Sequence, residues 1–123
     1  MESLIIRCIR NSNDNKTDDV IFISPSHLGY YTIKTYYAEI KKSYTQTISY
    51  LNVFGYINSL ITLLINDNMP FEFIQFDIPN TPSVLFKTNN LNSESIYNAI
   101  NNILHVTLEA WHLRVNQIVA STR

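Results

Sequence analysis

The chain has 123 residues, of which 46% are hydrophobic and 15% are charged. One globular domain is expected, since domains cluster near about 100–150 residues, and a disordered chain, which needs low hydrophobicity and high net charge, is excluded. Nine basic residues stand against ten acidic ones, so the net charge of −1 predicts no dominant basic surface for nucleic acid. Because the chain holds only two glycines, glycine-rich loops that bind phosphate are also excluded.

The single cysteine and the short apolar runs indicate the compartment. Cys8 cannot form an intramolecular disulfide, and its apolar neighbours favour a small buried side chain. The N-terminal apolar stretch is broken by Arg7, unlike a signal peptide, and the apolar region 53–65 is too short to cross a bilayer. We therefore expect a cytoplasmic protein without a membrane partner.

The N-terminal third predicts three strands. Leu4–Arg10 is short and rich in β-branched residues, and Val20–Ser24 resembles it across the polar tract Asn11–Asp19. A turn with Pro and Gly, Ser24–Gly29, precedes Tyr30–Ile40, which alternates aromatic, β-branched and polar residues and predicts a longer strand.

The middle of the chain predicts a helix and a hairpin. Apolar residues recur at steps of three and four through Thr47–Asn66, which indicates an amphipathic helix with a stripe at Ile48, Leu51, Phe54, Ile57, Ile61 and Leu64. Phe71–Ile78 and Ser83–Thr88 follow as strands around a turn that Pro79 and Pro82 bracket.

The C-terminal segment predicts a second helix. Asn92 can cap its start, and Glu94 complements the helix dipole. The apolar stripe includes Ile96, Ile100, Ile103, Thr107 and Trp111, and the helix can continue through Val115 and Ile118. The predicted order is βββαββα. We expect one α+β domain over residues 1–123, a two-layer sandwich in which two helices cover one face of an antiparallel sheet of about five strands.

Aromatic residues on the uncovered face of that sheet are candidates for partner binding. Exposed aromatic clusters mark interaction surfaces. Alternation along the strands places Tyr30, Tyr36, Phe71 and Phe73 on the face that the helices leave open. The sequence therefore favours a protein that binds a partner protein or a second copy of itself through that face or an edge strand.

A second group of residues fits nucleic acid. Lys34, Tyr37, Lys41 and Lys42 lie on or just after the third predicted strand, and aromatic rings with nearby cations bind single strands by stacking and charge. A single-stranded nucleic-acid-binding module is therefore the alternative function.

The sequence contains little that supports catalysis or metal binding. His105, Glu109 and His112 share one side of the second predicted helix, but the two histidines lie about 10 Å apart along the axis, at about 1.5 Å per residue. We interpret them as a polar helix face, and a metal-dependent hydrolase is the weakest alternative. No nucleophile elbow, phosphate-binding loop or Cys-x-x-Cys motif is present. We therefore expect no enzymatic activity, no catalytic residue, no metal and no cofactor.

The C-terminal half carries a resemblance. The residues concerned are Tyr50-Leu51, Leu63-Leu64, Asp67, Pro70-Phe71, Gln75, Pro79, Pro82-Ser83, Leu91, Thr107-Leu108 and Trp111. This pattern of a helix, a proline-bracketed hairpin and a second helix resembles small uncharacterised proteins of nucleocytoplasmic large DNA viruses. The resemblance implies an accessory or virion-associated protein of the infected host cytoplasm, and it assigns no catalytic residue.

Overall fold

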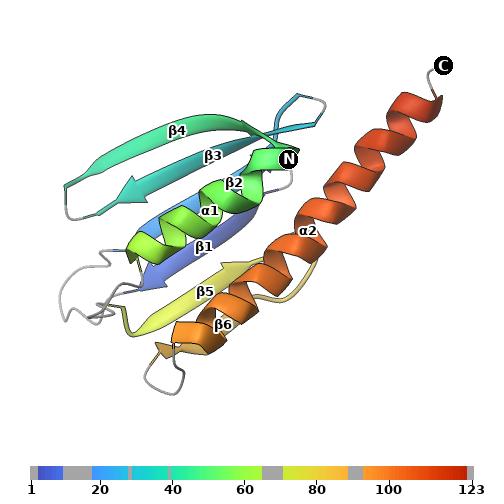
Figure 1. Cartoon of the computed structure of the whole chain (residues 1–123). Coiled ribbons are helices and arrows are strands. Elements are labelled where there is room, and N and C mark those ends of the chain that lie inside the picture. The colour runs from blue at the N-terminus through green and yellow to red at the C-terminus, as the bar shows by residue number, and fades with distance from the viewer. Residues whose placement is uncertain are drawn as a thin grey trace.

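The computed structural model describes residues 3–9, 18–27, 29–38, 40–64, 71–88 and 93–121, and side chains within these ranges except those of 64, 93 and 115–121. Within these ranges the chain forms six strands and two helices in the order ββββαββα (Figure 1). They are β1 (Leu4–Ile9), β2 (Asp19–Pro25), β3 (Tyr30–Tyr37), β4 (Lys42–Ser49), α1 (Tyr50–Leu64), β5 (Phe73–Asp77), β6 (Val84–Lys87) and α2 (Ser93–Ser121).

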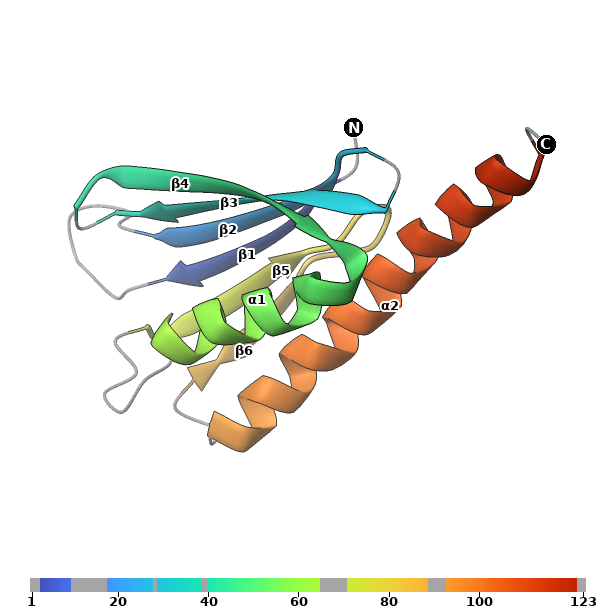
Figure 2. The same ribbon diagram turned by 45° about the horizontal axis from the view of Figure 1, so that its top comes forward.

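All six strands belong to one antiparallel sheet of order β4-β3-β2-β1-β5-β6. Both helices lie on the same side of this sheet, as the two views in Figures 1 and 2 show. The predicted α+β class, with an antiparallel sheet and helices on one face, is confirmed. The sheet has six strands where the sequence predicted about five.

The additional strand is β4, most of which lies in the stretch that the sequence left unassigned between the predicted strand Tyr30–Ile40 and the predicted helix Thr47–Asn66. Its last three residues, 47–49, were assigned to that helix. The chain turns after Tyr37, and Lys41 adopts a left-handed backbone conformation with φ of 52°. Lys42–Ser49 then pairs along β3, and α1 begins at Tyr50. The helical spacing of Ile48 and Leu51 suggested an earlier helix start because β4, being mostly polar, shows no alternation of apolar and polar residues.

The core lies between the sheet and the two helices. From α1 it takes Val53, Ile57 and Ile61, and from α2 it takes a longer stripe that ends at Trp111. Leu51 was predicted to belong to the stripe of α1, but it is 90% exposed. The buried face of the helix is marked by Val53, Ile57 and Ile61, which are spaced four residues apart, and Leu51 lies on the side that faces solvent. The strands complete the core, with Cys8 buried as the sequence predicted.

Helix α2 is longer than the sheet that it covers. Its 29 residues span about 43 Å at about 1.5 Å per residue, whereas a strand of 8 residues spans about 26 Å. Its C-terminal part therefore extends past the sheet, as Figure 2 shows. The prediction that the helix continues through 115 and 118 is confirmed, since α2 ends at Ser121.

Candidate functional site

The face of the sheet away from the helices, called the open face below, carries an apolar patch. In the register of β1 with its two neighbours, Ile5 lies opposite Phe22 and Ile9 lies opposite Phe73. Val20 lies beside them, opposite Arg7. These five apolar residues, Ile5, Ile9, Val20, Phe22 and Phe73, form the patch. Apart from Val20, which is buried, their side chains are half-buried, so that part of each remains accessible.

Three of the four residues predicted for partner binding lie on the open face. Tyr30, Tyr36 and Phe73 alternate with core residues of their strands, and Tyr30 is 46% exposed. Tyr36 lies opposite Val20 and therefore borders the patch. The prediction for Phe71 is wrong, because this side chain is only 2% exposed and belongs to the core. It precedes the first residue of β5, so the alternation of that strand does not extend to it.

The sequence contains a signal for this patch. Strands β1 and β2 place apolar residues on both faces, as Leu4 and Ile5 or Phe22 and Ile23 illustrate. Such strands are usual where layers cover both faces of a sheet. Here both helices cover the same face, so Ile5, Ile9 and Phe22 remain on the other one.

A polar network on β1 and β5 interrupts the patch, because Arg7 lies between Ile5 and Ile9 on the same face, opposite Gln75. Arg7 Nε donates to Asp77 Oδ2 over 3.2 Å, and Gln75 Nε2 and Ser83 Oγ donate to Asp77 Oδ1 over 2.8 and 2.6 Å. The hydrogen bond from Ser83, followed by that from Gln75, lowers the pKa of the Asp77 carboxyl below its ordinary value, against the opposing effect of burial. The carboxylate is thereby kept ionised and joins β5 to the turn that follows it.

The residues predicted for nucleic-acid binding do not share one surface. Lys34 is exposed on the open face, whereas Tyr37 and its cross-strand partner Lys42 lie on the helix side of the sheet. Lys41 belongs to the turn between β3 and β4. The predicted strand Tyr30–Ile40 is too long, since β3 ends at Tyr37 and the chain reverses there, so that the structure does not bring the four residues onto one surface.

The strand β4 forms one edge of the sheet, and no described strand pairs with its outer side. Its first six residues are exposed on both faces. From Ser43 to Ser49 its side chains carry no charge. The other edge strand, β6, has only four residues, follows Pro82–Ser83 and ends at Lys87. Short length, proline and lysine are devices that protect sheet edges from pairing, and β4 lacks them beyond Lys42.

The histidines of α2 pack against aromatic rings of α1. The ring of His112 stacks on Tyr50, with centroids 3.8 Å apart, and that of His105 stacks on Phe54 at 4.4 Å. His105 Nδ1 also lies 3.8 Å from Glu109 Oε1. Among the described residues no group of three or more His, Cys, Asp and Glu could hold a metal ion. The interpretation as a purely polar face is therefore corrected, because the two histidines form part of the contact between the helices.

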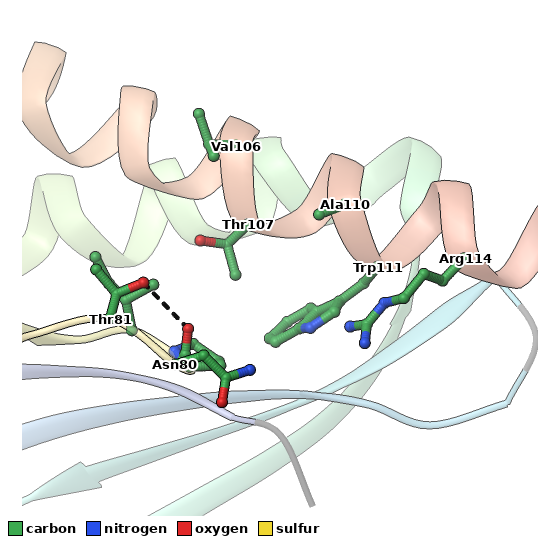
Figure 3. Close-up of a pocket in the computed structure, with 9 residues that line it drawn as sticks. Asn80, Thr81, Val106, Thr107, Ala110, Trp111 and Arg114 are labelled. Atoms are coloured by element: carbon green, nitrogen blue, oxygen red, sulfur yellow. Dashed lines mark hydrogen bonds between the residues drawn. The ribbon is translucent and has the colours of Figure 1, made fainter.

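A shallow groove separates α2 from the loop after β5 (Figure 3). Two adjoining cavities of about 270 and 290 Å³ share Ile78, Thr81, Val106 and Thr107, and hence form one groove. Figure 3 shows Val106, Thr107 and Trp111 on the helix side and Asn80 and Thr81 on the loop. The groove is open to solvent, since Val106, which lines both cavities, is 73% exposed, whereas ligand pockets bury most of the ligand surface. The groove is therefore a weaker candidate than the sheet surfaces.

Comparison with protein-family models, with curated proteins and with solved structures finds no significant match. Among the described residues, neither helix combines the length and the apolar character needed to span a membrane.

Proposed function

We propose that this protein is a non-enzymatic protein-interaction module that self-associates through its exposed sheet, at the edge strand β4 and on the open face. The observation that carries the proposal is the outer edge of β4. On its outer side this strand of eight residues has no pairing strand among the described residues, and its side chains are uncharged after Lys42. Such an edge is a ready template for pairing with another strand.

The apolar patch supports the same proposal. Soluble monomers seldom leave large contiguous apolar surfaces exposed, and such surfaces often mark interaction sites. Ile5 and Phe22 in the centre of the open face have no described helix or loop layer above them. We extend the proposal to an accessory or virion-associated role in the host cytoplasm, on the basis of the resemblance in the C-terminal half.

The test is the mass of the protein in solution. Light scattering coupled to size-exclusion chromatography should give at least twice the chain mass of 14.3 kDa. Phe73→Glu and Tyr36→Glu, which introduce charge on the open face, should each weaken association if that face takes part. The exposed Leu63→Glu, at the end of α1 that is distant in sequence from β4, is the matched control and should not change the mass. A monomer at every concentration would contradict the proposal.

The alternative function, binding of single-stranded nucleic acid, is favoured by one observation. Lys34 is exposed on the open face and lies opposite Phe22, with Tyr36 two residues along the same strand. Stacking on aromatic rings beside a cation is the usual mode of such binding. An oligonucleotide that binds at low salt, and whose binding is lost in Lys34→Glu, would replace our proposal. The loss of binding in Lys34→Glu should then exceed that in Lys41→Glu or Lys42→Glu, because these two lie elsewhere.

A further inference from the structure

The orientation of the β4 backbone shows which groups face outward. Tyr50 N–H donates to Gly29 O over 2.9 Å, so the backbone of Tyr50 points toward β3. In an antiparallel ladder this orientation alternates along the strand. Residues at even positions of β4 therefore bond to β3, and the residues whose N–H and C=O groups point away from it are Ser43, Thr45, Thr47 and Ser49.

These outward groups belong to a segment that is nearly a palindrome. Ser43–Ser49 reads Ser-Tyr-Thr-Gln-Thr-Ile-Ser, so the same residue types recur at equal distances on either side of Gln46, apart from Tyr44 and Ile48. We propose that a second copy of this chain pairs with β4 in antiparallel fashion, with Gln46 on the twofold axis. This inference rests on the proposed self-association and specifies its partner and its register.

The proposed register satisfies the outward backbone completely. Ser43 lies opposite Ser49 of the other copy and Thr45 lies opposite Thr47, so that all four outward residues exchange N–H···O bonds. A register centred on Thr45 would pair only three of them and would leave Ser49 out. The register centred on Gln46 is therefore the one that uses the full edge.

The side chains also match across the axis. Residues paired directly in an antiparallel sheet lie on the same face, so the helices of both copies cover the same face of one continuous sheet. On the open face this pairs Ser with Ser and Thr with Thr. On the helix face it pairs Tyr44 with Ile48 of the other copy, an aromatic and a β-branched side chain. Tyr44, which is 51% exposed and contacts the ring of Tyr37, gains a neighbour there.

Charge and space allow a second copy to pair with this edge. No charged residues face each other in the segment Ser43–Ser49, and each chain carries a net charge of only −1. The helix α1 turns back over its own sheet after Ser49, and α2 runs past the end of the sheet, so that neither described helix lies alongside the outer side of β4 (Figures 1 and 2).

Cysteine cross-linking tests the register directly. The two Gln46 residues would form a non-hydrogen-bonded pair with Cα atoms about 4.5 Å apart, which is within the range of a disulfide. We expect Gln46→Cys to give a covalent dimer under mild oxidation. Thr45→Cys is the matched control. In the proposed register the two residues 45 are offset by two positions along the strands, so their Cα atoms lie farther apart than the limit of about 7 Å for a disulfide, and this variant should not cross-link. The wild type, whose Cys8 is buried, should also stay uncross-linked.

The outcomes separate this inference from the proposed function. Cross-linking of Thr45→Cys without that of Gln46→Cys would overturn the register. If neither variant cross-links while the wild type is a dimer by light scattering, pairing through β4 is wrong, and only self-association through the open face remains of the proposed function. A monomeric wild type would end both.

A proline variant gives an independent test. Thr45→Pro removes an N–H that points outward, and proline is tolerated on edge strands in that orientation. We expect Thr45→Pro to be monomeric, whereas Thr45→Val, which keeps the N–H, should retain the dimer. Unchanged fluorescence of the single buried tryptophan, Trp111, would show that the proline variant is folded. A folded Thr45→Pro that remains dimeric would contradict the inference.

Discussion

Asp19 connects the buried part of the sheet to the turn that leads into β4. Its side chain lies on the helix side of β2 and is only 3% exposed. Asp19 Oδ1 accepts a hydrogen bond from the backbone N–H of Ala38, over 2.9 Å, at the start of the turn between β3 and β4. One residue of β2 therefore helps to determine where β3 ends and where β4 begins.

We expect Asp19→Ala to lower the free energy of unfolding by about 1–3 kcal/mol, because the Ala38 N–H loses a charged acceptor in a partly buried position. Urea denaturation followed by Trp111 fluorescence measures the change. Asp19→Asn is the control, since it keeps an acceptor oxygen and should lose less. If both variants lose the same amount, the hydrogen bond to Ala38 is not the source of the stabilisation.

Single residues were predicted well where the local pattern decides their position. Cys8 was expected in the core because its neighbours are apolar, and Trp111 because it lies on the apolar stripe of the second predicted helix; both are buried. Phe71 was not expected in the core. Its position depends on where β5 begins, and the end of a strand is determined by contacts with other parts of the chain. One backbone and one side-chain hydrogen bond join this region to other parts of the chain, since Glu72 N–H donates to Ile9 O and Thr88 Oγ1 donates to Phe71 O.

At the scale of elements, α1 contains a residue that weakens it. Gly55 lies in the helix interior, is exposed, and has no heavy atom within 4 Å of the place where a Cβ would stand. Glycine costs a helix interior about 1 kcal/mol relative to alanine, because its unfolded backbone has more conformational freedom. The helix is therefore less stable than its apolar stripe would allow.

Gly55→Ala should accordingly raise the free energy of unfolding by about 1 kcal/mol in thermal or urea denaturation. Gly29→Ala adds the same methyl group at the turn before β3, where φ is +78° and a side chain is strained. We expect that control to be destabilised. A neutral or negative effect of Gly55→Ala would mean that something other than intrinsic helix propensity governs α1.

The missed strand β4 shows why elements at an edge are hard to predict. A half-buried strand is recognised by apolar residues at every second position. In β4 both faces are exposed over most of the strand, and its sequence has no such alternation. It is a strand because β3 offers eight residues of extended backbone to pair with, from Tyr30 to Tyr37. That partner is supplied by the neighbouring strand and not by the residues of β4 themselves.

At the scale of the whole molecule, three tyrosines make the stability of the fold depend on pH. Burial is the main cause that raises the pKa of Tyr31, Tyr37 and Tyr50 above the ordinary value of 10.0. Neighbouring groups add to it, Tyr50 for Tyr31, Tyr56 for Tyr37 and Glu109 for Tyr50. The native state thus holds these phenol protons more tightly than the unfolded chain does.

The direction in which the free energy of unfolding changes with pH follows from proton linkage. A raised pKa in the folded state contributes stability that is fully present below pH 10 and is lost as the pH rises through the folded value. We expect the free energy of unfolding, measured in urea, to fall as the pH rises above about 10. The fall should be smaller in Tyr37→Phe, which cannot ionise there. An equal fall in both proteins would exclude Tyr37 as a contributor.

The sequence by itself determined the fold class and most of the core. Apolar residues with a period of two or of 3.6 define faces that must be buried, and this requirement predicts strands, helices and a two-layer arrangement without knowledge of any contact. Only the tertiary structure decided which surfaces remain. The uncovered patch around Ile5 and Phe22 exists because both helices pack on the same face of the sheet. The exposed edge exists because β4 is the outermost strand on one side of the sheet. Both are relations between elements distant in sequence, which local periodicity does not encode.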